Sequence, residues 1–547
     1  MESQEEKLLG TNGIDDDQKL QSKFLLSSVD RPEPPDMWSK DFIGFYSSYG
    51  AIGLVYGMGP TIIPFCAYVY EGDANVCSNA RSIVYFAWSL KVIVAMLTDC
   101  YRPMGKRRVV WMMFGWTGVM TCLLILAIFA KDIGVSAWLG LLMCIQGFIM
   151  FVDVPADGYG VEIGQLESHE RRGQVVVTAQ RIRFTFCILT ASIQTFLLNG
   201  PETSPDDCPI SFSNCWSWGL TINEYYGLLL AITFILTIPV YFLKELDGSS
   251  IPYHSFKELL HEVWKVLQNL TTYYLVIFVL GLYSFTHFSS RVNTTMQFYI
   301  IKLTNFQTGL DSLLSYIALV GAIYVFQTYL IRRNWRITEY FSNILTAVLG
   351  LLWILVYYDV GGLQNAWFTI FVDIDEQFSQ GISQVLYSIA VIELAAPGAE
   401  ATTQELIAST ANAAYTLNGV LATQLLFPLD ALACTDDDGN CPPNSVEAND
   451  KETYEASDGP NRYRNYALIL CSIAIAGSLI FVPFLPASRE MCYEWKLIGE
   501  REGLSKRRGY IALAMVTFAI SYGFVASVLE LDSSTSCLEI VGGTGCS

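Results

Sequence analysis

Three carboxylates lie within ten positions at the end of an apolar segment, in the stretch FIMFVDVPADGYGVEIG (residues 148–164). Asp153 and Asp157 are four residues apart, so they share one face of a helix. Pro155 between them has no backbone N–H and favours a bend that leaves carbonyl groups free for ligands. A carboxylate at membrane depth is costly and usually marks a transport pathway or an ion-paired site. Glu162 follows near the end of the segment, where its burial costs less.

Basic residues at a similar depth are the expected partners of these carboxylates. A short turn near Ser168 joins this apolar segment to the next one. Counted from that turn, Asp157 is level with Arg181 and Asp153 is level with Arg183. Lys91, within the apolar run AWSLKVIVAML, is a third buried cation. The pairs are either structural links between neighbouring helices or a switch that is remade as a site opens to one side and then the other.

The composition indicates what positions these charges. The chain has 547 residues, of which 52% are hydrophobic and 16% charged, and its mean hydropathy is +0.37. This is typical of an all-α polytopic membrane protein. We predict thirteen spans, with twelve as the alternative. The predicted spans are 42–66, 80–98, 109–130, 135–157, 174–198, 223–243, 271–290, 308–331, 338–358, 379–395, 411–430, 465–485 and 510–530.

The distribution of Lys and Arg predicts the orientation of the chain, because these residues gather on the cytosolic side of membrane proteins. They concentrate in alternate loops, which predicts a cytosolic N-terminus in a plasma membrane or endomembrane protein. The net charge of −19 comes largely from the tail and the outer loops, and it makes nucleic acid an improbable partner. The basic residues of the predicted cytosolic loops are Arg102, Lys106, Arg107, Arg108, Arg171, Arg172, Arg332, Arg333, Arg336, Lys506, Arg507 and Arg508.

Close cysteine pairs fall in segments that the charge distribution places outside. Disulfides persist in the extracellular or lumenal compartment, so these pairs are either disulfides or free thiols whose connectivity the sequence leaves open. The pairs are Cys208 with Cys215, Cys434 with Cys441, and Cys537 with Cys546.

The spans are organised as two halves around a linker. We expect an acidic cytosolic tail (1–40), a six-helix half (41–243), a linker (244–270), a second six-helix half (271–485) and a C-terminal region (486–547) with a basic segment and an extra span. The linker repeats apolar residues at helical spacing from Ser255 onward, which predicts an amphipathic helix on the cytosolic face. This layout resembles the major facilitator superfamily, whose halves are parallel repeats.

The loop after the second span carries a second charged motif, LTDCYRPMGKRR. Asp99, Gly105, Arg107 and Arg108 resemble the loop signature of that superfamily between spans two and three. Asp99 can accept bonds from the basic groups in one conformation and release them in another, as a conformational switch. The basic residues also suit an anchor to anionic lipid.

The second half repeats the acidic pattern of the first. In YSIAVIELAAPGAEATTQEL, Glu393 lies inside an apolar run, Pro397 and Gly398 interrupt it, and Glu400 follows. Interruptions at corresponding positions of two halves point to a binding site between them.

Three stretches together resemble the folate-biopterin transporters of the major facilitator superfamily. They are WSLKVIVAMLTDCYRPMGKRR, DVPADGYGVE and APGAEATTQELIASTANAA. The chain departs from the family at Val92, where proline is frequent, and in its extra span. The residues at family motif positions are Lys91, Asp99, Arg108, Asp153, Asp157, Glu162, Pro397, Gly398, Glu400 and Asn412.

This resemblance implies transport of a pteridine or a comparably polar metabolite, driven by a proton gradient. Asp153, Asp157 and Glu393 are the candidate proton carriers, because burial favours the protonated form of a carboxylate. In the seventh span, Tyr283, Phe285, His287 and Phe288 offer faces for a flat ring, and Arg291 could meet a substrate carboxylate.

Other classes of function remain alternatives at this point. The sequence has only four His and lacks the zinc-protease, nucleophile-elbow and phosphate-loop motifs, so neither an enzyme nor a metal or cofactor site is expected. A carrier of S-adenosylmethionine, a sugar or an amino acid would share the same topology. A receptor or scaffold that transports nothing would also tolerate the pattern. We expect a monomer.

Overall fold

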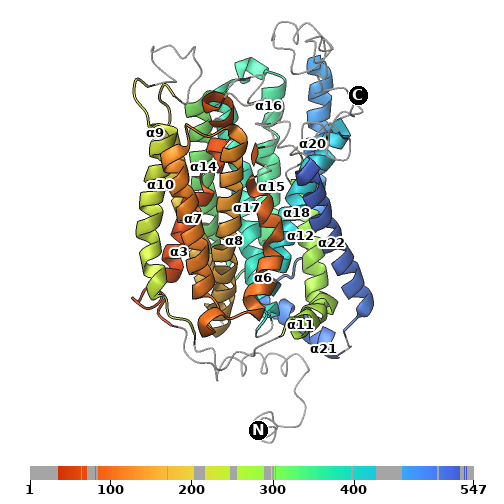
Figure 1. The fold of residues 1–547 in the computed structure, drawn as a ribbon. Coiled ribbons are helices and arrows are strands. Elements are labelled where there is room, and N and C mark those ends of the chain that lie inside the picture. The colour runs from red at the N-terminus through yellow and green to blue at the C-terminus, as the bar shows by residue number, and fades with distance from the viewer. Residues whose placement is uncertain are drawn as a thin grey trace, which may run out of the picture.

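A computed structural model of the chain describes residues 35–62, 65–70, 80–81, 84–168, 171–202, 216–246, 255–286, 288, 293, 297, 301, 303–395, 398–426, 459–501, 504–529, 535 and 538. Every regular element in these residues is helical. The long helices run side by side in one bundle, and the short helices α11 and α21 lie at its lower end (Figure 1). We call this end of the bundle the α11 end.

The first half contributes six helical traverses, several of them extended by short 3-10 or π turns. They are α3 (Ile43–Tyr56) with η1 (Gly59–Thr61) and η2 (Phe65–Val69), η3 (Phe86–Leu90) with α6 (Lys91–Cys100), α7 (Val109–Phe129), α8 (Val135–Leu166), α9 (Gln174–Leu197), and α10 (Ile222–Thr237) with η5 (Ile238–Phe242). The turn η4 (Pro103–Gly105) lies between α6 and α7.

The second half begins with the linker helix α11 (Phe256–Gln268) and ends with the extra helix α22 (Lys506–Leu529). Between them are α12 (Leu270–Thr286), α14 (Asn305–Val325) with η8 (Phe326–Leu330), α15 (Trp335–Gly350) with α16 (Trp353–Tyr357) and η9 (Val360–Gly362), α17 (Ala366–Leu394), α18 (Glu400–Leu426), α20 (Gly459–Ile480) with η11 (Val482–Phe484), and α21 (Arg489–Arg501).

Each predicted span overlaps a helix, but the helices differ in how well they suit a bilayer. Among the described residues, eight are long and apolar enough to cross a membrane alone, or up to nine if the bent pair α11 and α12 counts as one span. The eight include α22, as the predicted extra span requires. Helices α3 and α6 fall outside this group because they are short, and α17 and α18 because they are more polar.

Two boundaries differ from the prediction and change where the carboxylates lie. Helix α8 does not end at 157 but continues through Pro155 to Leu166, so Asp153, Asp157 and Glu162 all lie on one helix. Helix α18 begins at Glu400 rather than at 411, directly after Gly398 with its φ of +93°. The predicted loop residues from Glu400 onward therefore belong to a buried helix.

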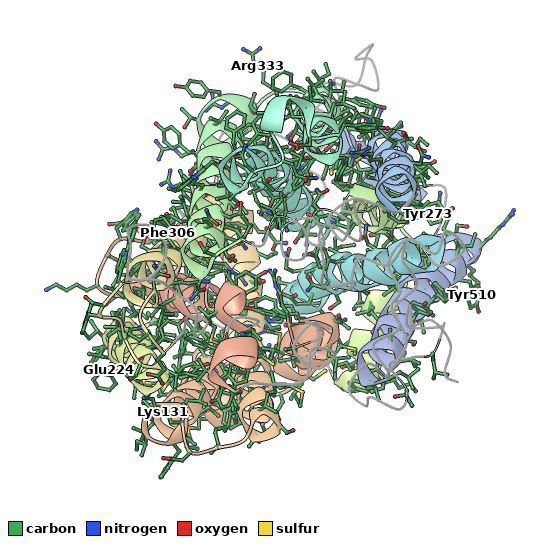
Figure 2. The ribbon with its side chains drawn as sticks, turned by 90° about the horizontal axis from the view of Figure 1, so that it is seen from above. Lys131, Glu224, Tyr273, Phe306, Arg333 and Tyr510 are labelled. Carbon is green, nitrogen blue, oxygen red and sulfur yellow. The ribbon has the colours of Figure 1, made fainter. Side chains whose placement is uncertain are left out.

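Two large hydrophobic cores accompany the two halves. One is built from residues between Met37 and Leu243, and the other mainly from residues between Leu267 and Val516. Seen along the bundle, the first half lies on the side of Lys131 and Glu224, and the second half lies on the side of Arg333 and Tyr510 (Figure 2). Helices α9 with α14 and α6 with α18 pack across the seam between them.

The linker helix forms as its pattern predicts. Ser255 and Glu258 make a reciprocal capping box at the start of α11, which satisfies backbone N–H groups that a helix end leaves free. Leu259 and Leu267 are buried, and α11 packs against α22. A bend of 77° separates α11 from α12, so α11 lies across the end of the bundle.

Close backbone packing of α3 on α9 generates the first testable prediction. A β-carbon at Gly53 would overlap the carbonyl oxygen of Arg183, so Gly53→Ala must push the two helices apart. We expect the apparent melting temperature of the purified protein to fall by several degrees, because interiors tolerate little overpacking. Gly140→Ala is the control, since its β-carbon would meet no atom within 4 Å. An equal effect of the two changes would contradict the packing.

Candidate functional site

Four helices bring five charged side chains together in the interior of the bundle. We call Lys91, Arg183, Asp153, Asp157 and Glu405 the central cluster, and all five are buried. The Lys91 ammonium lies 2.7 Å from Asp153, 3.2 Å from Asp157 and 2.8 Å from Glu405. Because Glu405 is on α18 and the other residues are on α6, α8 and α9, the cluster bridges the two halves of the molecule.

The expected pairing of the arginines on α9 is half correct. Arg183 lies 3.1 Å from Asp153, as the depth count predicts. The predicted pair of Arg181 with Asp157 is wrong, since Asp157 pairs with Lys91 and accepts a hydrogen bond from the Tyr49 hydroxyl. Two positions apart on a helix is about 200° of rotation, so Arg181 and Arg183 point in different directions.

Aromatic rings surround the two cations of the central cluster. The Arg183 guanidinium lies 5.3 Å from the ring centre of Tyr56 and 5.0 Å from that of Trp88. The Lys91 ammonium lies 5.4 Å from the Trp88 ring. Trp88 is itself held by a 2.9 Å bond from its indole N–H to Gln146. These rings supply cation–π attraction and present flat faces beside the charges.

The central cluster holds one more carboxylate than it holds cations. Asp153, Asp157 and Glu405 face Lys91 and Arg183, so its net charge is −1 when all five groups are ionised. A buried unbalanced charge is costly, so one bound proton or one cationic group of a ligand would balance the charge of the cluster.

Sequence reasoning missed Glu405 because the predicted span began six residues after it. A predicted helix that begins just after Pro397 and Gly398 would have included Glu405.

A second group of charges lies toward the α11 end, with its carboxylates one to three helical turns further along α6, α8 and α18 and its two arginines in the loop before α7. We call Asp99, Arg107, Arg108, Glu162 and Glu400 the loop cluster. Arg107 lies 3.0 Å from Asp99, 2.9 Å from Glu162 and 2.6 Å from Glu400. Arg108 lies 2.8 Å from both Asp99 and Glu162. The predicted motif loop therefore holds Glu400 of the second half.

Local structure explains how the loop presents its two arginines. Gly105, with φ of +76°, turns the chain after α6. The Glu245 carboxylate accepts bonds of 2.7 to 2.9 Å from the backbone N–H groups of Arg107, Arg108 and Val109, which caps the start of α7. On the other side of the seam, Asp99 accepts the backbone N–H and the hydroxyl of Thr402 at 2.8 and 2.7 Å. It thereby places negative charge at the start of α18, which a helix N-terminus favours.

Glu393 makes a third link between the halves. It is not part of the central cluster but pairs with Arg172, at 2.8 Å, beyond the end of α8. Gln165 donates to the carbonyl oxygens of Ile392 and Ala395, at 3.2 and 2.9 Å. Together these bonds tie the end of α17 to the turn between α8 and α9, again at the α11 end.

The aromatic residues of the seventh span that the structure describes contact other rings of the second half. Phe285 stacks on Phe288 and on Phe481, with ring centres 5.6 and 5.9 Å apart. The rings of Phe285 and Phe288 are therefore packed within the second half. Tyr283 is buried and meets Tyr387 edge to face. His287 and Arg291 lie outside the described residues.

The described residues carry no test of the predicted cysteine pairs. Cys208, Cys215, Cys434, Cys441, Cys537 and Cys546 all lie outside them, as does Pro397. Cys66, which the sequence analysis did not single out, is disulfide-bonded. Within the described ranges, no three His, Cys, Asp or Glu side chains are placed to hold a metal ion.

Comparison with known proteins agrees with this architecture. The model of the BT1 family matches residues 61–440. A crystal structure of the major facilitator superfamily transporter FucP in its outward conformation is similar, with a TM-score of 0.54, 13% identity, and coverage of 81% of this chain and 97% of that one. A variant of FucP, the E. coli fucose:proton symporter, has a TM-score of 0.52 and 12% identity over the same shares. No curated protein matches the sequence significantly.

Removing one member of the Arg183–Asp153 pair should be worse than removing both. Arg183→Ala changes the charge of the central cluster from −1 to −2, and stranding a buried charge costs about 3–5 kcal/mol. We therefore expect a severe loss of monodisperse protein in size-exclusion chromatography. Arg183→Ala with Asp153→Ala restores the charge to −1 and should recover part of the yield. Arg181→Ala is the control and should behave as the unmodified protein. The pairing is wrong if the double variant yields no more than the single one.

Glu167 should make stability depend on pH. It lies just beyond α8 and accepts the backbone N–H groups of Gly173 and Val175, at 2.6 and 3.1 Å. Burial raises its pKa from 4.5 to about 7, although these bonds oppose the rise. Between these values the folded protein retains a proton that the unfolded chain has released, so stability falls as pH rises through this window.

Glu167→Gln should flatten this dependence. We expect the apparent melting temperature of the variant to change less than that of the unmodified protein between pH 4.5 and 7.5. Glu202→Gln, in a half-exposed position paired with Lys131, is the control. An unchanged pH profile in Glu167→Gln would show that the folded-state pKa of Glu167 is ordinary.

Proposed function

The chain belongs to the BT1 family, an integral membrane transporter family with the fold of the major facilitator superfamily, and we propose from this premise that it is a proton-coupled carrier of a pterin-like solute. The observation that carries the proposal is the central cluster, with three buried carboxylates facing two cations across the seam between the halves. The transported solute and the proton would both act on this cluster. The carrier would work by alternating access.

Glu405 is the carboxylate that we assign to the coupling proton. It is fully buried, and its ion-pair partner in the described residues is Lys91, which it shares with Asp153 and Asp157. Its carboxylate oxygens accept no well-aligned hydrogen bond, whereas Asp153 is bonded by Arg183 and Asp157 by Tyr49. Protonation of Glu405 would balance the charge of the cluster and weaken the Lys91 bridge between the halves.

The ion pairs at the α11 end would allow the carrier to open alternately to the two sides of the membrane. The loop cluster and the Arg172–Glu393 pair hold the halves together at the α11 end. Opening this end requires Glu400 and Glu393 to leave their arginines, and closing it remakes the pairs. The basic loops lie at this end, so we assign it to the cytosol by the positive-inside rule. The structure described here then has its cytosolic end held shut.

The surroundings of the central cluster suit a flat, polar ring. A pterin presents an amino group beside a ring N–H. The two oxygens of one carboxylate can accept a hydrogen bond from each of these groups. Asp157 and Glu405 offer such carboxylates, and Tyr56 and Trp88 flank the cluster with aromatic faces that favour stacking. The family resemblance supplies the solute class, and the geometry agrees with it.

Transport by purified protein in liposomes tests the proposal. A labelled pterin or folate should accumulate when the outside is acidified, and it should exchange across the membrane without a gradient. Glu405→Gln mimics the protonated side chain and keeps its size. We expect this variant to retain exchange and to lose gradient-driven accumulation by at least 10-fold, because the coupling proton has no site.

Controls separate the solute class from the coupling. Glu202→Gln, with its partner Lys131 at 2.9 Å near the opposite end, should accumulate solute normally. Full accumulation by Glu405→Gln would refute its role in coupling. Stabilisation of the protein by a sugar, an amino acid or S-adenosylmethionine, with none by any pterin, would refute the solute class and leave the carrier mechanism standing.

A further inference from the structure

Another cation, Arg81, lies in the second span, ten residues before Lys91, and its side chain is exposed. Two of the tyrosines around it belong to the first half, and the other two belong to α14 and α18 of the second half. We call Arg81 and these tyrosines the Arg81 site, which therefore bridges the two halves. The titratable groups that act on Arg81 most strongly are Tyr415, Tyr85, Tyr316 and Tyr56.

The positions of the tyrosines place the Arg81 site within the bundle. Tyr316 lies eleven residues after the start of α14, and Tyr415 lies fifteen residues after the start of α18. Along α18, Tyr415 follows Glu405 by ten residues, or about 15 Å. An exposed guanidinium at this depth faces water rather than lipid, because a charge in lipid is costly. The loop cluster holds the α11 end shut, so this water enters from the opposite side.

Aromatic rings connect the Arg81 site to the central cluster. The Trp88 ring, which lies beside both cations of the central cluster, meets the Tyr56 ring edge to face with centres 5.1 Å apart. The Tyr56 ring meets the Tyr85 ring in the same way at 5.4 Å. The Tyr85 hydroxyl also donates to the Tyr56 carbonyl oxygen at 2.8 Å. A row of three rings therefore runs from the central cluster toward Arg81.

Arg81 differs from the cations of the central cluster in its lack of an acidic partner. Lys91 and Arg183 are both paired with buried carboxylates. Arg81 forms no ion pair with any residue that the structure describes, and no carboxylate is among the groups that act on it most strongly. A cation at membrane depth without a counter-charge usually marks a ligand site or a transport pathway. The free charge of Arg81 and its contact with water suit an anion.

We propose that Arg81 binds a carboxylate of the transported solute, at the end of the solute that lies away from the central cluster. This inference rests on the carrier function proposed above and adds the charge and shape of the solute to it. A guanidinium holds a carboxylate through two parallel N–H bonds, and tyrosine hydroxyls can donate to its remaining lone pairs.

The distance between the two sites sets the shape of the solute. The levels of Glu405 and Tyr415 differ by about 15 Å along α18, which is more than a single pterin ring covers. The solute is therefore elongated, with its ring at the central cluster, its carboxylate at Arg81 and its middle part along the row of rings, where aromatic groups stack.

Ligand binding to the full-length protein in detergent, measured by isothermal titration calorimetry, tests this site. Folate carries its carboxylates at the end of a long linker, pterin-6-carboxylate carries one directly on the ring, and biopterin carries none. The test variant is Arg81→Gln. The matched control is Arg333→Gln, which removes an exposed arginine from the loop before α15.

We expect Arg81→Gln to bind folate about 30-fold more weakly, because hydrogen bonds between charged groups are lost. Its affinities for biopterin and pterin-6-carboxylate should be unchanged, since neither compound reaches Arg81. Arg333→Gln should bind all three compounds as the unmodified protein does. Arg81→Lys keeps the charge without the paired N–H geometry and should weaken folate binding to a smaller extent. This variant carries the test if Arg81→Gln yields no folded protein.

Unchanged folate affinity in the Arg81 variants, or an equal loss for all three compounds, would overturn the role of Arg81. Equal sensitivity of folate and pterin-6-carboxylate would overturn the elongated arrangement. Failure of the proposed function would give a different result. If an amino acid stabilises the protein while no pterin does, and Arg81→Gln removes that effect, the pterin class is refuted and Arg81 still binds the carboxylate.

Discussion

The Lys91 ammonium imposes the strictest constraint on this molecule. A buried cation is tolerated only where carboxylates replace the water that it loses, and Lys91 finds three within 3.2 Å. Two come from α8 and one from α18, so α6, α8 and α18 must converge at one depth. Of these three helices, α8 is long and apolar enough to cross a membrane alone, whereas α6 and α18 are not. Helix α7 packs against α8, and α12 and α22 pack against α18.

These same three helices carry the three carboxylates of the loop cluster. Along α6, Asp99 follows Lys91 by eight residues, or about 12 Å, and along α18 Glu405 follows Glu400 by five. A tilt or shift of any one helix therefore acts on both clusters. This coupling does not depend on a chain of intermediate contacts, because a helix transmits displacement along its own axis. Arg172 and Glu393 extend the seam to α17, outside these three helices.

Sequence reasoning predicted the helices and most of the charged residues. It failed where the result depended on where a helix begins or on the direction in which a side chain points. The Asp153–Arg183 pair followed from counting residues to a shared turn. The same count misplaced Arg181, because level residues still differ in the direction in which their side chains point. Glu405 was lost to a span boundary, since polar residues at the start of α18 looked like a loop. The tertiary contacts of Glu245 and the stacking of Phe285 on Phe481 have no local signal in the sequence.

The uncompensated carboxylate of the central cluster also makes the proposed cycle sensitive to voltage. Without a proton the cluster carries one negative charge, and with a proton it is neutral. An elementary charge that crosses the whole membrane field changes energy by about 2.3 kcal/mol per 100 mV. The membrane potential would therefore act on the step in which the unprotonated carrier reorients, and would leave the protonated step nearly untouched. The cell's electrical state, as much as its pH gradient, would then set how fast the carrier turns over.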